Sequence, residues 1–266
     1  MVGDEAHFWE RIIRISERGD AEGMEVRIGI TTSFEAGEQR LHHTYVQAIE
    51  RAGGLPVIVP MLEAGTEAFA DLLDGLVLTG GPAVTDRLIG ALPPDIDETD
   101  PVRARSDRRV LAAFMKARKP VLGICYGMQL LNAVRGGSIF ADVERQSNGA
   151  SVHSSGRGAD VHPVRLVEGS HLHDILGTDT LMVNTRHVQA VAEVGAGFTV
   201  SATSPDGVVE AIESADGLLI GVQFHPERMG EAMQPLFRRL VDQARKRRRH
   251  PPGQCPPNGA GINLST

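Results

Sequence analysis

The sequence contains little cysteine and no long apolar run. Only Cys125 and Cys255 occur among 266 residues, so one chain can form neither a disulfide framework nor a zinc site of four thiolates. No segment approaches the roughly 18 consecutive apolar residues that a membrane span needs. Residues 1–19 mix charged residues with isoleucine and lack the apolar core of a signal peptide. We therefore expect a cytoplasmic protein that does not enter a membrane.

Acidic residues outnumber basic ones, with 34 Asp and Glu against 27 Lys and Arg, so the formal net charge is −7. A negative surface excludes nonspecific binding of nucleic acid over the whole molecule. The basic run at residues 245–249 is interpreted as the end of a helix, where cations suit the negative end of the helix dipole. With 41% hydrophobic and 23% charged residues, the chain has the composition of a globular domain with a sizeable core.

Strand and helix patterns alternate in the first half of the chain. Apolar strands are predicted at residues 26–30, 55–59, 75–78 and 120–124, and helices at residues 43–52, 67–73 and 102–117. Such alternation predicts an α/β fold with an open, mostly parallel central sheet and helices on both faces.

The second half of the chain has a different pattern of apolar residues. Short apolar alternations at residues 138–140, 164–167 and 208–212 are separated by Gly, Ser and Asp, and they predict additional mixed or antiparallel strands. A buried strand at residues 218–224 and a final helix at residues 231–246 complete the pattern.

Two ends fall outside the predicted domain, which spans residues 24–246. Residues 1–23 form an N-terminal extension: either translation starts at Met24, or the extension forms a short amphipathic helix that docks on the core or on a partner. Residues 247–266 are rich in Arg, Pro and Gly, and we expect them to form a disordered C-terminal tail.

Cys125 lies where the fourth predicted strand meets an apolar helical run. The sequence Gly-Ile-Cys-Tyr-Gly-Met-Gln at residues 123–129 is typical of a nucleophile elbow with cysteine in place of serine. Gly123 and Gly127 allow the sharp turn, and the N-terminus of the following helix favours a thiolate. Taken alone, the pattern also fits a buried structural cysteine.

A base and a group that orients it follow the last predicted core strand. His225 and Glu227 lie two residues apart, so an extended backbone would point both side chains the same way. The carboxyl ends of parallel strands share one edge of the sheet, which places this pair near Cys125. Most of the other histidines are interpreted as surface or satisfied polar residues, and no residue is assigned to a metal.

These motifs resemble those of a known superfamily. The segment at residues 123–129, together with Gly-Val-Gln-Phe-His-Pro-Glu at residues 221–227, resembles the class I glutamine amidotransferases. The segment Val-Asn-Thr-Arg-His-Val-Gln-Ala-Val at residues 183–191 is similar to a signature of the γ-glutamyl-γ-aminobutyrate hydrolase branch, the peptidase C26 family. The resemblance covers about residues 24–244 and implies a flavodoxin-like order of the parallel strands.

The resemblance also implies a role for each matching residue. Cys125 would attack a γ-glutamyl carbonyl, His225 would act as general base and then acid, and Glu227 would hold the imidazole. The backbone N–H groups of Gly81 and Tyr126 would form the oxyanion hole. Without this triad, Gly81 would be interpreted as part of a plain turn.

Three further residues are weaker candidates for holding the glutamyl end of the substrate. They are Gln129, Asn184 and His187, and each also fits a structural polar residue. The resemblance implies no cofactor and no metal.

Departures from the family pattern fall near the expected substrate pocket. Ala104 follows Arg103 where the family has Asp, Asp107 replaces a Glu, Ala83 replaces an Asp, and Val188 replaces a His. Because Ala83 and Ala104 remove acceptors for a cationic amine, we expect a substrate other than a typical γ-glutamyl polyamine conjugate.

Three functions are compatible with these motifs. The first is a thiol hydrolase that cleaves a γ-glutamyl amide of a small molecule through a thioester, and the second is a glutaminase subunit that delivers ammonia to a separate synthase. The third is a non-catalytic binding or regulatory protein on the same scaffold. The partners considered are a γ-glutamyl compound or glutamine, a synthase, and a second copy of the chain in a homodimer; nucleic acid and membranes are not among them.

Overall fold

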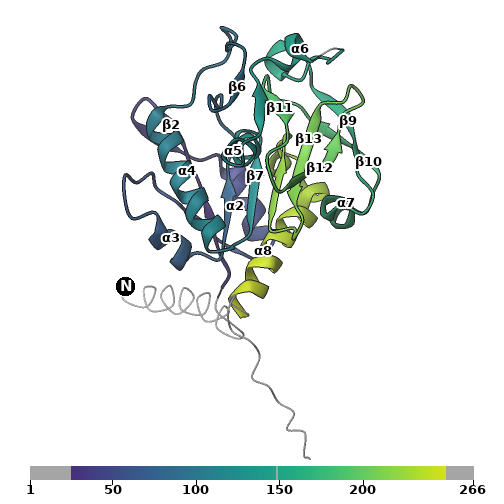
Figure 1. Cartoon of the computed structure of the whole chain (residues 1–266). Coiled ribbons are helices and arrows are strands. Elements are labelled where there is room, and N and C mark those ends of the chain that lie inside the picture. Colours follow the sequence, from purple (N-terminus) through teal and green to yellow (C-terminus); the bar gives the residue numbers. More distant parts are fainter. Residues whose placement is uncertain (1–24, 148, 250–266) are drawn as a thin grey trace, which may run out of the picture.

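A sheet of twelve strands lies at the centre of the computed structural model, which describes residues 25–147 and 149–249 (Figure 1). Five neighbouring strands are parallel, in the order β4 (Leu55–Ile58), β1 (Arg27–Ile30), β5 (Gly75–Leu78), β7 (Val121–Ile124) and β14 (Leu219–Val222). Numbered along the chain, this order is 2-1-3-4-5, that of flavodoxin-like folds. The predicted parallel sheet is therefore confirmed. The N-terminal extension and Cys255 lie outside the described residues.

Helices cover both faces of the parallel strands (Figure 1). On one face, Ile49 of α2 (His43–Arg51) and Phe237 of α8 (Gln234–Arg249) belong to an apolar cluster that contains Ile28 of the sheet. On the other face, Phe114 and Leu131 pack in a second cluster. That face is covered by α3 (Glu67–Leu72), α4 (Pro101–Lys116) and α5 (Tyr126–Val134). Strands buried on both faces explain why their sequences are continuously apolar.

The second half of the chain extends the sheet with antiparallel strands. Beyond β14 follow β13 (Val209–Ser214), β12 (Phe198–Thr203), β9 (Val161–Leu166) and β10 (Thr180–Asn184). A branch off this path contains β11 (Ala190–Glu193), β8 (Ser138–Phe140) and β6 (Leu88–Ile89). The predicted mixed and antiparallel strands are thus present.

Several short elements were not predicted from the sequence. They are the hairpin of β2 (Ser33–Glu35) and β3 (Glu38–Arg40), and the helices α6 (Val143–Gln146) and α7 (His171–Leu176). The hairpin is largely exposed and rich in charged residues, so it shows no alternation of apolar and polar positions.

Helix α8 continues further than expected. It ends at Arg249, three residues inside the segment predicted to be disordered. Arg248 donates to the carbonyl oxygen of Glu25 at 2.8 Å and lies 3.3 Å from a carboxylate oxygen of Asp74, so tertiary contacts keep the last turn helical. The remaining tail lies outside the described residues.

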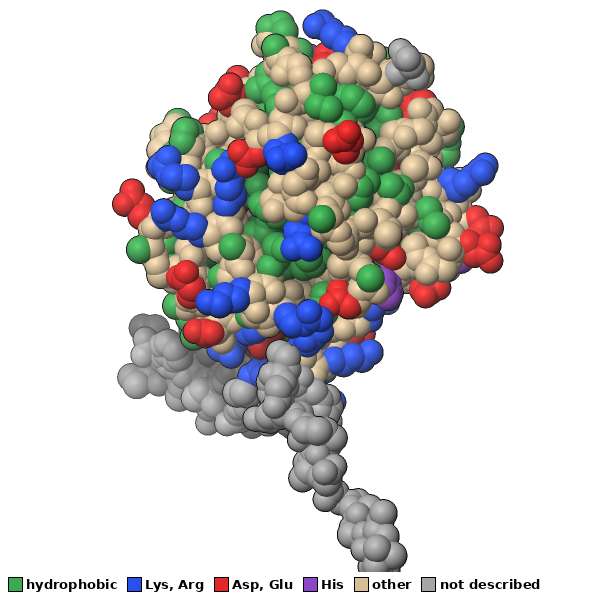
Figure 2. Space-filling model, viewed as in Figure 1, with side chains coloured by type: hydrophobic (Ala, Val, Ile, Leu, Met, Phe, Trp, Pro, Cys, Tyr) green, Lys and Arg blue, Asp and Glu red, His purple; other side chains and the backbone are tan. Residues whose placement is uncertain are grey.

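The surface carries charges of both signs. Figure 2 shows acidic and basic side chains interspersed over one face, with basic side chains gathering near the end of α8. Within residues 25–147 and 149–249, every helix is too short or too polar to cross a lipid bilayer.

Candidate active site

Cys125 occupies a strained turn between β7 and α5. Its backbone has φ +52° and ψ −105°, a conformation that a residue with a side chain rarely adopts. The residue is only 6% exposed. A Cβ atom at Gly127 would lie 2.3 Å from the carbonyl oxygen of Leu78, so only glycine lets α5 approach β5 this closely. The small residues expected around the elbow are therefore required by backbone contacts.

The pairing of β7 with β14 brings His225 to Cys125. Ile124 is in register with Val222, and the Cys125 N–H donates to the Val222 carbonyl at 2.8 Å. The imidazole of His225 interacts with the side chain of Cys125, and its Nδ1 lies 2.8 Å from Oε1 of Glu227. These three side chains form a continuous series, as expected from the sequence.

The backbone that joins His225 to Glu227 is not extended, contrary to the sequence expectation. Pro226–Arg228 forms a single 3₁₀ turn after β14 ends at Val222. This turn brings the carboxylate of Glu227 next to the imidazole of His225. The contact between the two side chains therefore depends on a tight backbone turn, and not on side chains that alternate along an extended strand.

Burial and hydrogen bonding act in opposite directions on His225. Burial alone lowers the pKa of its imidazole, but the hydrogen bonds to Cys125 and Glu227 outweigh this effect and raise the pKa from 6.5 to about 10. The imidazolium form is therefore favoured at neutral pH. Burial, with a contribution from the charge of Glu227, raises the pKa of the nearby Tyr45 and keeps its phenol protonated.

Asn184 fixes the backbone of His225. Its amide nitrogen donates to the His225 carbonyl at 2.8 Å, and its oxygen accepts the His225 N–H at 2.9 Å. This residue was a candidate for contacting the substrate. In the structure, both polar ends of its amide are bonded to one residue, so Asn184 positions the backbone of His225.

The two backbone N–H groups expected to form an oxyanion hole have no protein partner among the described residues. Within the described part of the chain, the N–H groups of Gly81 and Tyr126 make no hydrogen bond. Tyr126 is the first residue of α5, where N–H groups lack partners inside the helix. The neighbouring N–H of Gly80 is already bonded to the hydroxyl of Tyr45 at 3.0 Å. The N–H groups of Gly81 and Tyr126 are therefore free to bind a substrate oxygen.

Arg103 stabilises the Gly80–Gly81 turn through hydrogen bonds to its backbone. Its buried guanidinium donates to the carbonyl oxygens of Thr79 and Gly80 and pairs with Asp107 at 3.1 Å. A Cβ atom at Gly81 would lie 2.2 Å from Nη1 of Arg103. The carboxylate of Asp107 therefore neutralises the buried guanidinium of Arg103.

The other tentative substrate residues are also engaged by protein groups. Gln129 is 2% exposed and donates its amide N–H groups to the Gln189 carbonyl at 3.2 Å and to Oε1 of Gln223 at 3.1 Å. His187 is 4% exposed and lies in a separate group of buried titratable side chains, with His153, His162 and Glu210. The hydrogen bonds of both side chains thus go to groups other than Cys125.

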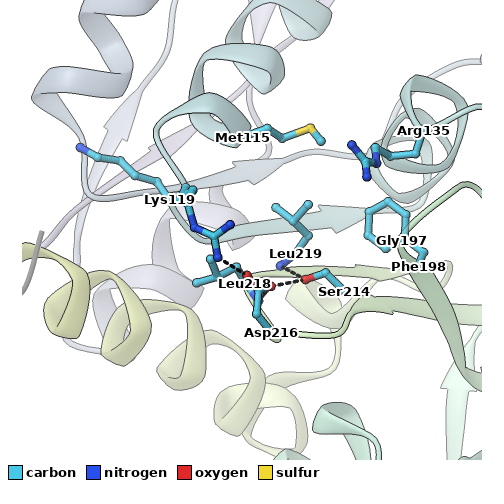
Figure 3. Close-up of a pocket in the computed structure, with 10 residues that line it drawn as sticks. Met115, Lys119, Arg135, Gly197, Phe198, Ser214, Asp216, Leu218 and Leu219 are labelled. Atoms are coloured by element: carbon cyan, nitrogen blue, oxygen red, sulfur yellow. Dashed lines mark hydrogen bonds and ion pairs between the residues drawn. The ribbon is translucent and has the colours of Figure 1, made fainter. Parts of the chain in front are cut away.

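A distinct hollow of about 210 Å³ lies at the opposite edge of the sheet (Figure 3). Lys119, which lines it, comes just before β7, whereas Cys125 comes just after that strand. Arg118 and Asp216 form an ion pair of 2.8 Å at its rim. None of the predicted site residues contributes to this hollow.

Two residues that support the site were missed from the sequence. Tyr45 and Arg103 were not assigned any role near Cys125, although both hold the turn that contains Gly80. The alternating pattern of the chain gave no signal, because their partners are backbone groups 35 and 23 residues away.

The strand order and the cysteine at the end of the fourth parallel strand define the class I glutamine amidotransferase fold. A solved structure from Thermoplasma acidophilum, whose name describes a GMP synthase subunit, superposes with a TM-score of 0.61 and 19% identity, over 86% of this chain and 98% of that one. At this identity the similarity concerns the fold.

Sequence comparisons identify the family. The peptidase C26 family model matches residues 24–227. Protein NtpR of Enterococcus hirae is 36% identical over 190 residues, which cover 69% of this chain and 79% of the relative. The γ-glutamyl-γ-aminobutyrate hydrolase PuuD of Escherichia coli is 31% identical over 200 residues, 71% of this chain and 79% of that protein. The chain belongs to the peptidase C26 family and is an enzyme of the hydrolase or amidotransferase type.

Proposed function

We propose that this protein hydrolyses the γ-glutamyl amide bond of a small molecule through a thioester on Cys125 and releases glutamate and an amine. The observation that carries the proposal is the arrangement of Cys125 at a strained strand–helix turn with His225 beside it, and of Glu227 bonded to His225. The family supports a C–N hydrolase or amidotransferase but leaves the substrate open.

The acylation step uses the favoured protonation state of His225. The thiolate sulfur attacks the amide carbon, and the carbonyl oxygen becomes an oxyanion. This oxyanion accepts hydrogen bonds from the backbone N–H groups of Gly81 and Tyr126. As the C–N bond breaks, the imidazolium donates its proton to the leaving nitrogen. A γ-glutamyl thioester and a neutral amine result.

Deacylation reverses the direction of proton transfer. The imidazole of His225, now neutral, takes a proton from water as the water oxygen attacks the thioester. When the C–S bond breaks, glutamate leaves, and the sulfur and imidazole regain their starting states. Glu227 stabilises the imidazolium each time it forms, because its carboxylate accepts a hydrogen bond from the Nδ1–H group.

The alternative with a specific observation in its favour is a glutaminase subunit. The fold is shared with a protein whose name describes a GMP synthase subunit. In that case glutamine would be the substrate, and the ammonia would pass to a synthase partner. A non-catalytic binding protein is a weaker candidate, because it gives no reason for the strained cysteine beside a charged histidine.

The test measures glutamate and ammonia by mass spectrometry after incubation with glutamine, γ-glutamyl amines and γ-glutamyl peptides. We expect release of glutamate from a γ-glutamyl amide, and a loss of at least about 10³-fold in Cys125→Ala. Cys255→Ala is the matched control and should retain activity.

Each outcome separates the candidates. Turnover of glutamine alone, stimulated by a synthase, would favour the glutaminase subunit. Turnover that survives in Cys125→Ala would contradict the thioester mechanism. Efficient cleavage of γ-glutamylputrescine with a micromolar KM would contradict the prediction, drawn from Ala83 and Ala104, that polyamine conjugates are poor substrates.

A further inference from the structure

Four titratable side chains converge in the interior of the antiparallel half of the sheet. We define them as the His₃Glu cluster, which consists of His153, His162, His187 and Glu210. Glu210 is fully buried, the side chains of His153 and His187 are 1% exposed, and the side chain of His162 is 14% exposed. Burying a carboxylate together with three imidazoles costs much free energy unless their polar atoms find partners.

The inward atoms of the His₃Glu cluster have no hydrogen-bond partners. They are Nδ1 of His153, Nε2 of His162, Nε2 of His187 and both carboxylate oxygens of Glu210. Buried polar atoms without partners are rare in folded proteins. Four of these atoms, one from each residue, lie within 4.8 Å of one another, which indicates a bound group that they share.

The three distances from Glu210 to the histidine nitrogens match the coordination shell of a small cation. Oε1 of Glu210 lies 3.5 Å from Nδ1 of His153, 3.4 Å from Nε2 of His162 and 3.5 Å from Nε2 of His187. A zinc ion about 2.0–2.1 Å from four tetrahedral ligands separates neighbouring ligand atoms by roughly 3.3–3.4 Å. One ligand atom from each of the four residues lies within 4.8 Å of all the others.

The other ring nitrogen of each histidine, which points away from Glu210, contacts an oxygen atom of the protein. The contacts are His153 Nε2 with Oδ2 of Asp206 at 3.0 Å, His162 Nδ1 with the Pro163 carbonyl at 3.1 Å, and His187 Nδ1 with the Gln189 carbonyl at 2.9 Å. A carbonyl oxygen can only accept, so the proton of His162 and of His187 lies on the outward nitrogen. Each neutral ring then directs a lone pair inward, as metal-binding histidines do.

Protonated imidazoles paired with the carboxylate explain this geometry less well. Glu210 and Asp206 can together neutralise at most two of the three imidazoles, and the distances of 3.4–3.5 Å from Oε1 of Glu210 are too long for strong charge-assisted hydrogen bonds. The rings of His153 and His162 have centroids 4.8 Å apart, so two charged rings would repel each other.

We propose that the His₃Glu cluster binds one zinc ion in a structural site. Three imidazole nitrogens and one carboxylate oxygen are a zinc donor set, and four protein ligands leave no open position for catalysis. The ligands come from the loop before β9, from β9, from the loop between β10 and β11, and from β13. The ion therefore ties together segments that β12 separates in the sheet.

The proposed zinc site is linked to the candidate active site through one loop. His187 lies three residues after Asn184, whose amide holds the backbone of His225. The His187 N–H also donates to the His153 carbonyl at 3.0 Å, which joins the two ligand-bearing loops. The zinc ion would hold this loop in place without contacting the reacting atoms.

The test uses the full chain without a polyhistidine tag, stripped with a chelator, loaded with zinc chloride and desalted. Mass spectrometry of the metal should give about one zinc per chain in the wild type and in Cys125→Ser, and less than about 0.2 in His187→Ala. His43→Ala, which alters an exposed histidine outside the cluster, should bind like the wild type. Zinc should raise the Tm of the wild type by about 5 °C or more and leave His187→Ala unchanged.

Diffraction of wild-type crystals at the zinc absorption edge keeps the proposal falsifiable if His187→Ala fails to fold. An anomalous peak within bonding distance of Glu210 and the three inward nitrogens is the expected result. Less than about 0.1 zinc per loaded wild-type chain, equal zinc content in a folded His187→Ala, or a peak located elsewhere would each overturn the proposal.

Discussion

The charge of one residue, His225, links the geometry of the site to its chemistry. Its pKa is raised to about 10, above the value of 6.5 expected in an unfolded chain. The protonated imidazole therefore contributes stability that is fully present below pH 6.5 and is lost as the pH rises through about 10. Proton donation to the leaving amine should fail over the same alkaline range.

Glu227→Gln should move the alkaline limb of the pH profile. The neutral amide stabilises the imidazolium less than a carboxylate does, so the pKa of His225 falls. We expect the limb of kcat/KM to shift by at least about one pH unit toward neutral pH, with activity reduced at pH 9 more than at pH 7. Glu231→Gln alters an exposed carboxylate and serves as the control. A limb at the same pH in both variants would show that Glu227 does not set the charge of His225.

Cys125 should be the residue that iodoacetamide inactivates. A sulfur beside a cationic imidazole is a strong nucleophile, so we expect one alkyl group per chain at Cys125 and a parallel loss of activity. Peptide mass spectrometry identifies the labelled residue. Labelling confined to Cys255, with activity retained, would refute the assignment.

Helix α5 shows how an element positions a reacting atom. Its N-terminus lies against β5 because Gly127 has no side chain, and this approach sets the direction of the Cys125 turn. The same contact explains why the helix begins at Tyr126, directly after the cysteine.

Gly127→Ala should disturb both packing and activity. The added Cβ would lie 2.3 Å from the Leu78 carbonyl oxygen, so α5 must move outward, at a cost of about 2 kcal/mol in the free energy of unfolding. Displacement of the Tyr126 N–H should lower kcat by about 10²-fold. Gly156→Ala, where the nearest atom is 3.5 Å away, should stay within about 0.5 kcal/mol of the wild type in chemical denaturation. Equal stabilities of the two variants would contradict this account.

Elements differ in how far the sequence predicted them. The parallel strands were predictable, because each is an apolar run that ends at glycine, proline or a polar loop. Cys125, His225 and Glu227 were predictable as well, since each lies in a short motif next to such a strand. The contacts of Tyr45 and Arg103, and the His₃Glu cluster, depend on side chains that meet only in three dimensions. The pattern of neighbouring residues in the sequence does not predict such long-range contacts.

At the scale of the whole molecule, the two ends of the described chain meet. Arg248 of α8 bonds to Glu25, which precedes β1, and to Asp74, which precedes β5. Asp74 also accepts the backbone N–H of Arg27 at 2.8 Å. The last turn of α8 thus closes the fold at the edge opposite Cys125.

A chain truncated after residue 246 should be less stable than one truncated after residue 249. The shorter chain loses the Arg248 contacts and leaves Asp74 with fewer cationic neighbours, which should cost about 1–2 kcal/mol and lower the Tm by about 2–6 °C. Kinetic parameters should stay similar, because the cut is remote from the thiol. Calorimetry on the two truncated chains checks the difference, and equal Tm values would show that the last turn adds nothing.

The adjacency of β7 and β14 has a consequence for the order of folding. The two strands pair in parallel, yet the chain between them forms the whole antiparallel half of the sheet. Closing so long a connection is entropically slow, so contacts between β7 and β14 should form after the local hairpins of that half. During refolding, the elbow around Cys125 would exist before its imidazole arrives. The protein would then gain compactness first and catalytic competence last.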